Sequence, residues 1–488
     1  MNPRLERFAR YAVGAGAALL LASAATSKPA VDLESIGSPV QAAPVDPVIA
    51  QAIAQISPEQ IRRTIQTLVG FGTRNSLSSM ATDLPAGQGI NAAADWIESE
   101  LQRYAAACHG CLEVKRDSFT ETAQDRIPQP TTITNLYAVL RGSDPAQAQR
   151  VYLVSGHYDS RISDVLDAHG AAPGANDDAS GVAVSLECAR VLSGLKPSAT
   201  LVFAIVAAEE QGLNGSRHLA KLAKAQGWDV EGVLSNDIVG GNTTPGDIRQ
   251  NKSLVRVFSE GTPAAATPEQ LKLIVSLGYE SDSPSRELAR ALLDVSATYA
   301  NSLRDFHPVL EFRRDRFLRG GDHTSFNEEG FPAVRFTEWR EDFNHQHQNL
   351  RIENGVEYGD LLKFVDVRYV SRVATVNAAA LASFAYAPAA PLNVRVLTKA
   401  LDNNTTLEWE PGVGAAADTQ YEVLWRELSA PQWQRFVNVK ALAPAQGVAS
   451  APVERATVPI SKDNVIFGVR AVDARGHRSP AVVPWPVR

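Results

Sequence analysis

Short apolar runs alternate with helical patterns through the middle of the chain. The runs are mostly continuous rather than alternating, as expected for strands buried on both faces of a sheet. They cover residues 151–155, 201–208, 233–235 and 333–336. Between them, residues 181–193 and 216–225 carry helical patterns. Alternating strands and helices predict an α/β fold with a mainly parallel mixed sheet and helices on both faces.

Helices flank this alternating region on both sides. Ser57 is a candidate N-cap, followed by Pro58 at the first helical position and by Gln60, a capping-box residue. Residues 90–104 repeat apolar positions with a period of 3.6 residues, which predicts a second helix. A long helix over residues 361–386 is expected to close the first domain, which spans residues 48–388.

The pattern changes after residues 387–391, which have the composition of a linker. Short alternating segments separated by turn residues predict a small all-β sandwich domain over residues 392–488. Trp409, the Tyr421-x-Val423 strand and a closing Val-Asp-x-x-Gly-x-x-Ser segment make this region resemble a fibronectin type III domain. Such a domain could bind a protein or surface partner.

The N-terminus has the features of a secretory signal peptide. Three arginines precede an apolar stretch over residues 11–24, which ends in the small-residue pattern Ala22-Ser23-Ala24. The stretch is shorter than the roughly 20 residues of a spanning helix, which disfavours a membrane anchor. We therefore predict a signal peptide at residues 1–24, a linker at 25–47 with order beginning near Val48, and a secreted or periplasmic protein without a membrane span after cleavage.

Composition and cysteine content narrow the class of protein. The chain has 488 residues and a net charge of -7, which disfavours a nucleic-acid partner because such binding neutralises phosphates. Export permits a disulfide between Cys108 and Cys111, although in a cytosolic chain the same spacing would suggest redox or metal chemistry. Cys188, within a predicted apolar helix, is expected to be a buried thiol.

Acids and histidines follow the predicted strands in five short segments. A carboxylate at the end of a buried strand needs a hydrogen bond, an ion pair or a cation, because its desolvation is costly. Imidazole nitrogen and carboxylate oxygen are zinc ligands. The segments are Gly156-His157-Tyr158-Asp159-Ser160, Asn176-Asp177-Asp178-Ala179-Ser180-Gly181, Ala208-Glu209-Glu210-Gln211-Gly212, Ser235-Asn236-Asp237 and Asn344-His345-Gln346-His347.

Each segment alone has a simpler interpretation. His157 with Asp159 can be a polar loop pair, Glu209-Glu210 can lie on a solvated face, and Asp178 can cap a helix. The five segments together, each at or after a strand end, favour a metal site.

Their order and spacing resemble the co-catalytic zinc aminopeptidase family, which includes bacterial leucyl aminopeptidases, glutamate carboxypeptidase and the enzymatically silent transferrin receptor. The resemblance covers roughly residues 57–388. It implies two zinc ions, a bridging Asp177 and a cis peptide bond between Asp177 and Asp178. The implied metal ligands are His157, Asp177, Glu210, Asp237 and His347.

The resemblance also implies roles around the metals. Glu209 is the general base, and Asp159 accepts a hydrogen bond from the His157 imidazole N–H that is not on the metal. Asp322 and His323 correspond to residues that line the substrate cleft, with Gly321 where the family commonly has serine; a turn with a capping aspartate is the alternative interpretation.

The last ligand has two candidates, His345 and His347. The residues after His347 are Gln348 and Asn349, where the family has a small hydroxyl residue and an aspartate. We favour His347 because residues 342–344 match the approach to the ligand in related enzymes.

The predicted function is that of an exported dinuclear zinc peptidase, an aminopeptidase acting on peptides. A carboxypeptidase or glutaminyl cyclase on the same scaffold is the alternative among enzymes, and a cyclase generally works with one zinc. A non-catalytic binding protein is the alternative from another class. Retention of the five ligands and of Glu209 argues against the last.

Overall fold

The computed structural model describes residues 36–440 and 453–487. The predicted signal peptide lies outside these residues, as does the first part of the predicted linker. From Ser38 onward the chain forms one compact unit. In the described ranges, no helix combines the length and the apolar character that a membrane crossing requires.

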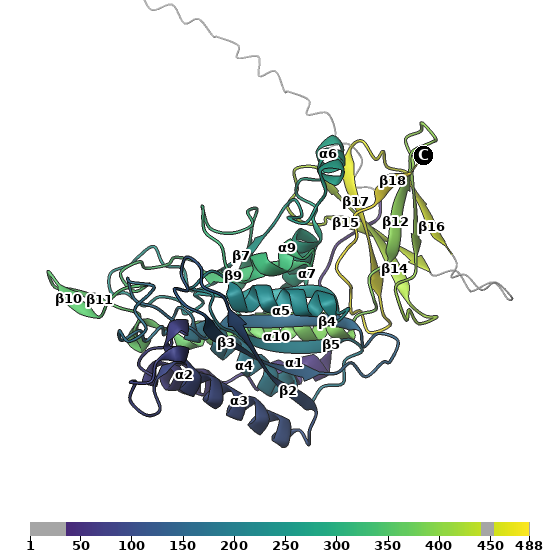
Figure 1. Ribbon diagram of the computed structural model, residues 1–488. Helices are drawn as coiled ribbons and strands as arrows, with labels where there is room; N and C mark the ends of the chain where they lie inside the picture. The colour runs from purple at the N-terminus through teal and green to yellow at the C-terminus, as the bar shows by residue number, and fades with distance from the viewer. Residues whose placement is uncertain (1–35, 441–452, 488) are drawn as a thin grey trace, which may run out of the picture. The chain divides into compact units, whose positions relative to one another are not determined.

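The larger region is built on an eight-stranded mixed sheet with the order β2-β3-β5-β4-β6-β9-β7-β8 (Figure 1). Its central strands β5, β4, β6 and β9 are parallel, which confirms the predicted fold class. β7 also runs parallel to β8. The antiparallel pairs are β2 with β3, β3 with β5, and β7 with β9. The strands are β2 (Leu112–Glu121), β3 (Thr131–Leu140), β4 (Arg150–His157), β5 (Thr200–Val206), β6 (Asp229–Asn236), β7 (Leu254–Ser259), β8 (His307–Glu311) and β9 (Ala333–Glu338).

Helices cover both faces of this sheet (Figure 1). One buried apolar cluster joins the sheet to α5 (Asn214–Ala225) and α9 (His323–Glu328). The larger cluster joins its other face to α1 (Pro47–Ile53), α2 (Pro58–Gly70), α3 (Gly89–Ala107), α4 (Ala179–Leu192), α7 (Pro284–Thr298) and α10 (Val367–Tyr386). The remaining elements are the helical turns η2 (Ser76–Met80) and η3 (Leu362–Phe364), α6 (Pro268–Leu277), α8 (Ala300–Leu303), and the hairpin of β10 (Arg351–Glu353) and β11 (Val356–Tyr358).

Two helix starts show how local chemistry sets these boundaries. Ser57 caps α2 as predicted, because its side chain accepts from the Gln60 N–H. In a capping box the Gln60 side chain would accept the Ser57 N–H, but that N–H donates to Glu187 Oε1 at 2.6 Å. The final helix begins at Val367, later than predicted, because Asp366 caps it by accepting from two backbone N–H groups.

The C-terminal region is an all-β sandwich, as the sequence predicts. Trp409 of one sheet contacts Tyr421 of the other edge-on, with ring centroids 5.4 Å apart. One sheet has the order β1-β15-β14-β17 and the other β16-β13-β12-β18. The strands are β1 (Ser38–Pro39), β12 (Leu392–Leu397), β13 (Thr405–Glu410), β14 (Gln420–Glu427), β15 (Arg435–Lys440), β16 (Glu454–Val458), β17 (Val465–Val472) and β18 (Trp485–Val487). The resemblance to fibronectin type III stays a prediction.

The segment before Val48 is ordered earlier than predicted. β1 pairs antiparallel with β15, so residues from Ser38 onward belong to the sandwich rather than to a linker. A two-residue strand whose partner lies far along the chain leaves no periodic pattern, which is why the sequence does not reveal it.

Polar contacts join the sandwich to α7. Trp433 Nε1 donates to Glu287 Oε2 at 2.9 Å, and Arg470 Nη1 lies 2.7 Å from Asp294 Oδ2.

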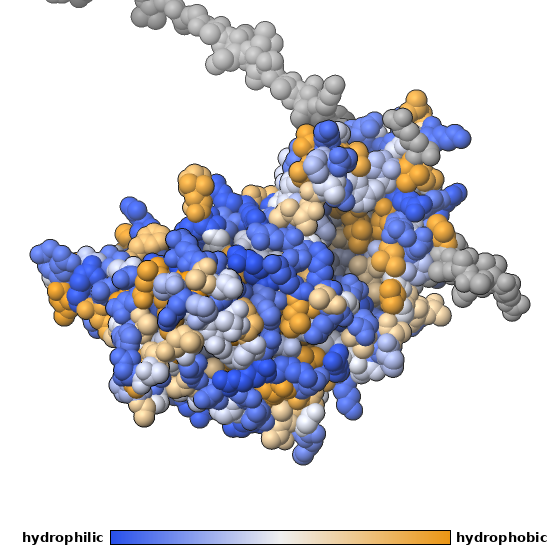
Figure 2. Space-filling model, viewed as in Figure 1, coloured by the Kyte–Doolittle hydropathy of each residue, from blue (hydrophilic) through white to orange (hydrophobic). Residues whose placement is uncertain are grey.

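The Cys108–Cys111 disulfide is formed and Cys188 is buried, as predicted. On the face shown in Figure 2, hydrophobic residues are scattered among hydrophilic ones, in keeping with burial of most apolar side chains in the cores.

Candidate metal centre

The predicted site residues gather at the carboxyl edge of the central parallel strands. His157 is the last residue of β4, and Asp237 directly follows β6. Glu209 and Glu210 lie just after β5, and Asp177 lies just before α4. Carboxyl ends of adjacent parallel strands meet at one edge, so segments far apart in sequence become neighbours there.

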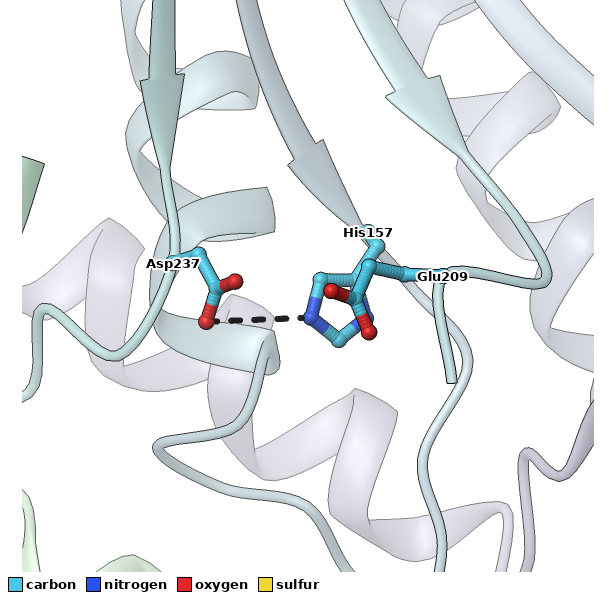
Figure 3. A group of neighbouring side chains, drawn as sticks. All are labelled: His157, Glu209 and Asp237. Carbon is cyan, nitrogen blue, oxygen red and sulfur yellow. Dashed lines mark ion pairs between the residues drawn. The ribbon is translucent and has the colours of Figure 1, made fainter. Parts of the chain in front are cut away.

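One cluster consists of His157, Glu209 and Asp237, whose ligand atoms lie within 4.8 Å of one another. Figure 3 shows the three side chains reaching toward one another from neighbouring strand ends. His157 Nε2 lies 3.9 Å from Asp237 Oδ1, and within residues 36–440 and 453–487 this buried nitrogen has no hydrogen-bond partner. A ring nitrogen without a partner among carboxylates is the donor that a cation would take up.

The second cluster consists of Asp177, Glu210 and His347. His347 Nε2 lies 2.9 Å from Asp177 Oδ2 and 2.9 Å from Glu210 Oε1. Asp177 also faces the first cluster, since its Oδ1 lies 3.3 Å from His157 Nε2. Asp177 therefore stands between the two histidines.

His345 takes a different position. Its ring stacks on Phe364 with centroids 3.5 Å apart, and its Nδ1 lies 3.1 Å from Thr244 Oγ1. Of the two candidate histidines, the structure brings His347 to the acidic cluster.

The chemistry of these donors fits divalent zinc. All are imidazole nitrogens or carboxylate oxygens, and His157 Nε2 has no hydrogen-bond partner among the residues that the structure describes. Burial lowers the pKa of His347, but Glu210 and Asp177 outweigh it and raise that pKa to about 10. A proton on His347 thus supplies positive charge that a bound cation could supply instead.

Hydrogen bonds to backbone N–H groups hold the ligand-bearing segments together. His157 Nδ1 lies 3.2 Å from the backbone carbonyl oxygen of Asp159 and 3.4 Å from its carboxylate Oδ1. The two carboxylate oxygens of Asp159 accept from the N–H groups of Glu209 and Glu210 at 3.3 and 3.1 Å. Asp159 therefore joins the ends of β4 and β5.

Asp178 also joins segments that are distant in sequence, whereas the sequence indicated only that it could cap a helix. Its carboxylate accepts from the N–H groups of Gly181 at 2.9 Å, His157 at 3.0 Å and Ile238 at 3.3 Å. The Asp177–Asp178 peptide bond is cis, as the resemblance implies. This single carboxylate ties the start of α4 to the ends of β4 and β6.

Sequence reasoning missed Asp360 and Arg74. Asp360 accepts from the N–H groups of Asn176 and Asp177 at 2.8 and 2.7 Å, and burial raises its pKa to about 7. The buried Arg74 donates to four backbone carbonyls, including those of Tyr158 and Gly174. Both act on backbone groups distant in sequence, so no local motif marks them.

The clusters open onto a cleft of about 630 Å³. Asp322 and His323, predicted to line it, are instead buried and absent from its walls. His323 Nε2 lies 2.9 Å from the Arg314 carbonyl oxygen. The cleft is lined by Arg126, Arg161, Asp177, Glu209, Glu210, Gly212, Leu213, Asp237, Arg316, Leu318, Arg319, Gly320, Phe343, Gln346, His347 and Gln348.

Arg335 explains the glycine at position 321. A Cβ on Gly321 would lie 2.4 Å from Arg335 Nη1, so a serine would force this buried arginine to move. Arg335 Nη2 also lies 2.9 Å from Asp237 Oδ2. Gly321 therefore leaves room for an arginine that positions a candidate metal ligand.

Comparison with known proteins agrees with this geometry. The profile described as "Peptidase family M28" matches residues 135–351. A "Probable zinc metalloprotease" of Pyrenophora teres f. teres is 43% identical over 93% of this chain and 90% of its own length. A probable zinc metalloprotease of Leptosphaeria maculans is also 43% identical, over 92% of this chain and 99% of its own.

A solved structure shares the fold. LapA of Legionella pneumophila superimposes with a TM-score of 0.50 and 20% identity, covering 70% of this chain and 78% of that chain. At this identity the likeness shows the architecture alone.

Proposed function

Because the chain belongs to peptidase family M28 and is a zinc metallopeptidase, we propose that it is an aminopeptidase with two zinc ions. The position of Asp177 carries the proposal: one oxygen faces His157 at 3.3 Å and the other faces His347 at 2.9 Å. Two-metal hydrolases hold ions about 3.5–4 Å apart with shared ligands of this kind.

Five side chains would hold the ions. His157 and Asp237 complete one site, Glu210 and His347 complete the other, and Asp177 belongs to both. Bound zinc would supply Lewis acidity that polarises the scissile carbonyl and makes a water molecule more acidic. The chain itself would supply orientation, through the backbone contacts of Asp159, Asp178 and Asp360.

Glu209 is the proposed general base. It lines the cleft beside the ligands, and burial, together with the charges of Glu210 and Asp237, raises its pKa although His157 opposes the shift. A carboxylate with a raised pKa can take a proton from the attacking water and return it to the leaving amine. Free N-terminal amines are the proposed substrates because the five segments resemble those of aminopeptidases.

We also propose that the protein acts outside the cytoplasm. The Cys108–Cys111 disulfide supports this, since disulfides persist in oxidising compartments. Mass determination of the mature N-terminus tests the proposal, and a chain that retains residue 1 in the culture fluid or in cells would contradict cleavage after Ala24.

A matched substrate panel tests the activity. Zinc-loaded protein is expected to release leucine from leucine amide and to leave N-acetyl-leucine amide intact. Equal hydrolysis of the blocked substrate would refute the aminopeptidase proposal. Release of the C-terminal residue from N-acetyl-leucyl-glycine would indicate a carboxypeptidase, and cyclisation of an N-terminal glutamine without hydrolysis would indicate a cyclase.

A further inference from the structure

We propose that Arg161 forms a carboxylate-binding subsite in the cleft, assisted by Arg126. The subsite would take a carboxylate on the substrate residue that follows the scissile bond. The inference rests on the proposed peptidase function and adds a substrate class to it: peptides that carry a negative charge next to the bond that is cleaved.

The Arg161 side chain has a hydrogen-bond donor that no described residue satisfies. Its side chain is 16% exposed and lines the same cleft as Glu209 and Asp237. In the described part of the chain its buried Nε has no hydrogen-bond partner, and the nearest carboxylate oxygen is Glu210 Oε2 at 3.8 Å. An arginine presents five N–H donors, and leaving a buried donor unpaired costs free energy. A ligand carboxylate could satisfy two donors at once.

The backbone under Arg161 is held in place. The preceding residue, Ser160, donates its N–H to the Arg74 carbonyl oxygen at 3.2 Å and its hydroxyl to the Ala172 carbonyl oxygen at 2.7 Å. Arg126 approaches the same region, because its Nη1 donates to the Glu210 carbonyl oxygen at 3.0 Å. The two guanidinium groups thus flank the segment that bears Glu210.

Other arginines on the cleft are already engaged. Arg316 Nη1 and Arg319 Nη1 each lie 2.9 Å from Glu341 Oε2. Both contacts are of hydrogen-bond length, whereas Arg161 Nε lies 3.8 Å from Glu210 Oε2 and has no hydrogen-bond partner among the described residues. This difference singles out Arg161 and offers Arg319 as a matched control.

Charge favours an anionic ligand once cations occupy the metal sites. The four acids of the cleft are the proposed base and three of the proposed ligands, so their charge would then be offset. The arginines would dominate the remaining potential around Arg161, which attracts a carboxylate.

Arg161 lies beside a proposed metal ligand, so a carboxylate that it binds would be within about one residue of the cleaved bond. A peptide extends by about 3.3–3.6 Å per residue. Arg161 Nε lies 3.8 Å from an oxygen of the proposed ligand Glu210. The carboxylate could be the free C-terminus of a dipeptide or an acidic side chain at the second residue.

Paired substrates separate these two sources. Leucyl-glycine is compared with leucyl-glycine amide for the terminal carboxylate, and leucyl-aspartate amide with leucyl-asparagine amide for the side chain. In zinc-loaded wild type we expect kcat/KM to favour the charged member of at least one pair by roughly 10-fold or more, as for a charge-assisted hydrogen bond. Arg161→Gln should bring that ratio close to one, whereas Arg319→Gln should preserve it.

Zinc content is measured on each variant so that loss of metal is not mistaken for loss of selectivity. Ratios near one for both pairs in wild type, or a ratio unchanged in Arg161→Gln, would overturn the subsite while leaving the aminopeptidase proposal intact. If wild type cleaves neither pair, the proposed function fails. Calorimetric titration with N-acetylglycine and N-acetylglycinamide then tests the subsite. Tighter binding of N-acetylglycine in wild type, lost in Arg161→Gln, supports the subsite. Equal binding of the two compounds by wild type refutes it.

Discussion

Two regions of the molecule bury several charged side chains, and they stabilise them differently. Where the sandwich meets α7, each buried acid has an arginine or a tryptophan N–H as partner: Asp282 pairs with Arg290 and Arg426, Glu287 accepts from Trp433, and Glu422 pairs with Arg470. At the carboxyl edge of the sheet, the acids Asp177, Glu209, Glu210 and Asp237 face two histidines. Arg335 divides its charge between Asp237 and Asp315, and Arg161 lies 3.8 Å from Glu210.

The difference distinguishes structure from chemistry. A buried ion pair that is complete within the protein needs nothing further, and removing one partner leaves an uncompensated charge. An acidic cluster that lacks enough cationic side chains is stable when cations or protons supply the missing charge. The surplus of carboxylates at the sheet edge is therefore the physical reason to expect metal there and not at the sandwich.

The largest expected effect comes from removing the sandwich. A chain ending at Pro388 would lack Arg426, Trp433 and Arg470, which are the sandwich partners of Asp282, Glu287 and Asp294. It would also lack the strand that pairs with β1. The position of every proposed ligand before the linker suggests a dispensable domain, but these contacts predict a fragment that does not fold. Circular dichroism and thermal unfolding of the fragment test this, and a cooperatively folded, active fragment would contradict it.

Replacing a single arginine at the same boundary should also reduce stability. Arg426 and Asp282 are both almost fully buried, so Arg426→Met should lower the free energy of unfolding by about 3–5 kcal/mol. Arg455 pairs with Glu408 on the surface of the sandwich, and Arg455→Met should cost less than about 1 kcal/mol. Urea denaturation of both variants makes the comparison, and equal losses would show that burial does not decide the effect.

At the metal edge, Glu209→Gln should affect turnover rather than stability. The substitution removes the proposed proton acceptor and none of the five proposed ligands, so turnover should fall by at least about 100-fold. Zinc content and the unfolding midpoint should stay close to wild type. Near-normal turnover in a fully loaded Glu209→Gln protein would refute the role of Glu209.

The smallest effect concerns Glu260, a buried acid outside both regions. Burial raises its pKa to about 7, so the protonated form is the one that the fold stabilises. Its contribution is present below the unfolded pKa of about 4.3 and is lost as pH rises toward 7. Glu260→Gln should therefore be more stable than wild type at pH 8, by about 1–3 kcal/mol, and similar at pH 4.5. Parallel thermal unfolding at the two pH values checks the sign.

Much of the fold is predictable from the sequence because its central strands are continuous apolar runs and its helices carry a 3.6-residue apolar pattern, with a recognisable cap at Ser57. The edge strand β2 is less visible, since most of its residues are at least partly exposed and few are apolar. β1 depends on a partner strand that lies far along the chain. The late start of α10 depends on the capping aspartate Asp366. Neither produces hydrophobic periodicity.

The site divides in the same way. Side chains that would touch metal lie in short motifs at strand ends, and the structure brings all of them together. Asp360 and Arg74 hold the backbone of these motifs from distant loops, and Arg335 occupies the space that a side chain at Gly321 would need. Asp322 and His323 were expected on the cleft wall but are buried, and Leu318 and Gly320 line the wall instead.

Zinc stoichiometry of Asp177→Asn tests the central claim most directly. If the acids at the sheet edge hold two ions with Asp177 between them, wild type binds two equivalents of zinc and Asp177→Asn loses both. His345→Ala is the matched control, because His345 stacks on Phe364 away from the clusters, and it should keep two equivalents. One equivalent in wild type, or loss of only one from Asp177→Asn, would contradict the bridged two-metal centre.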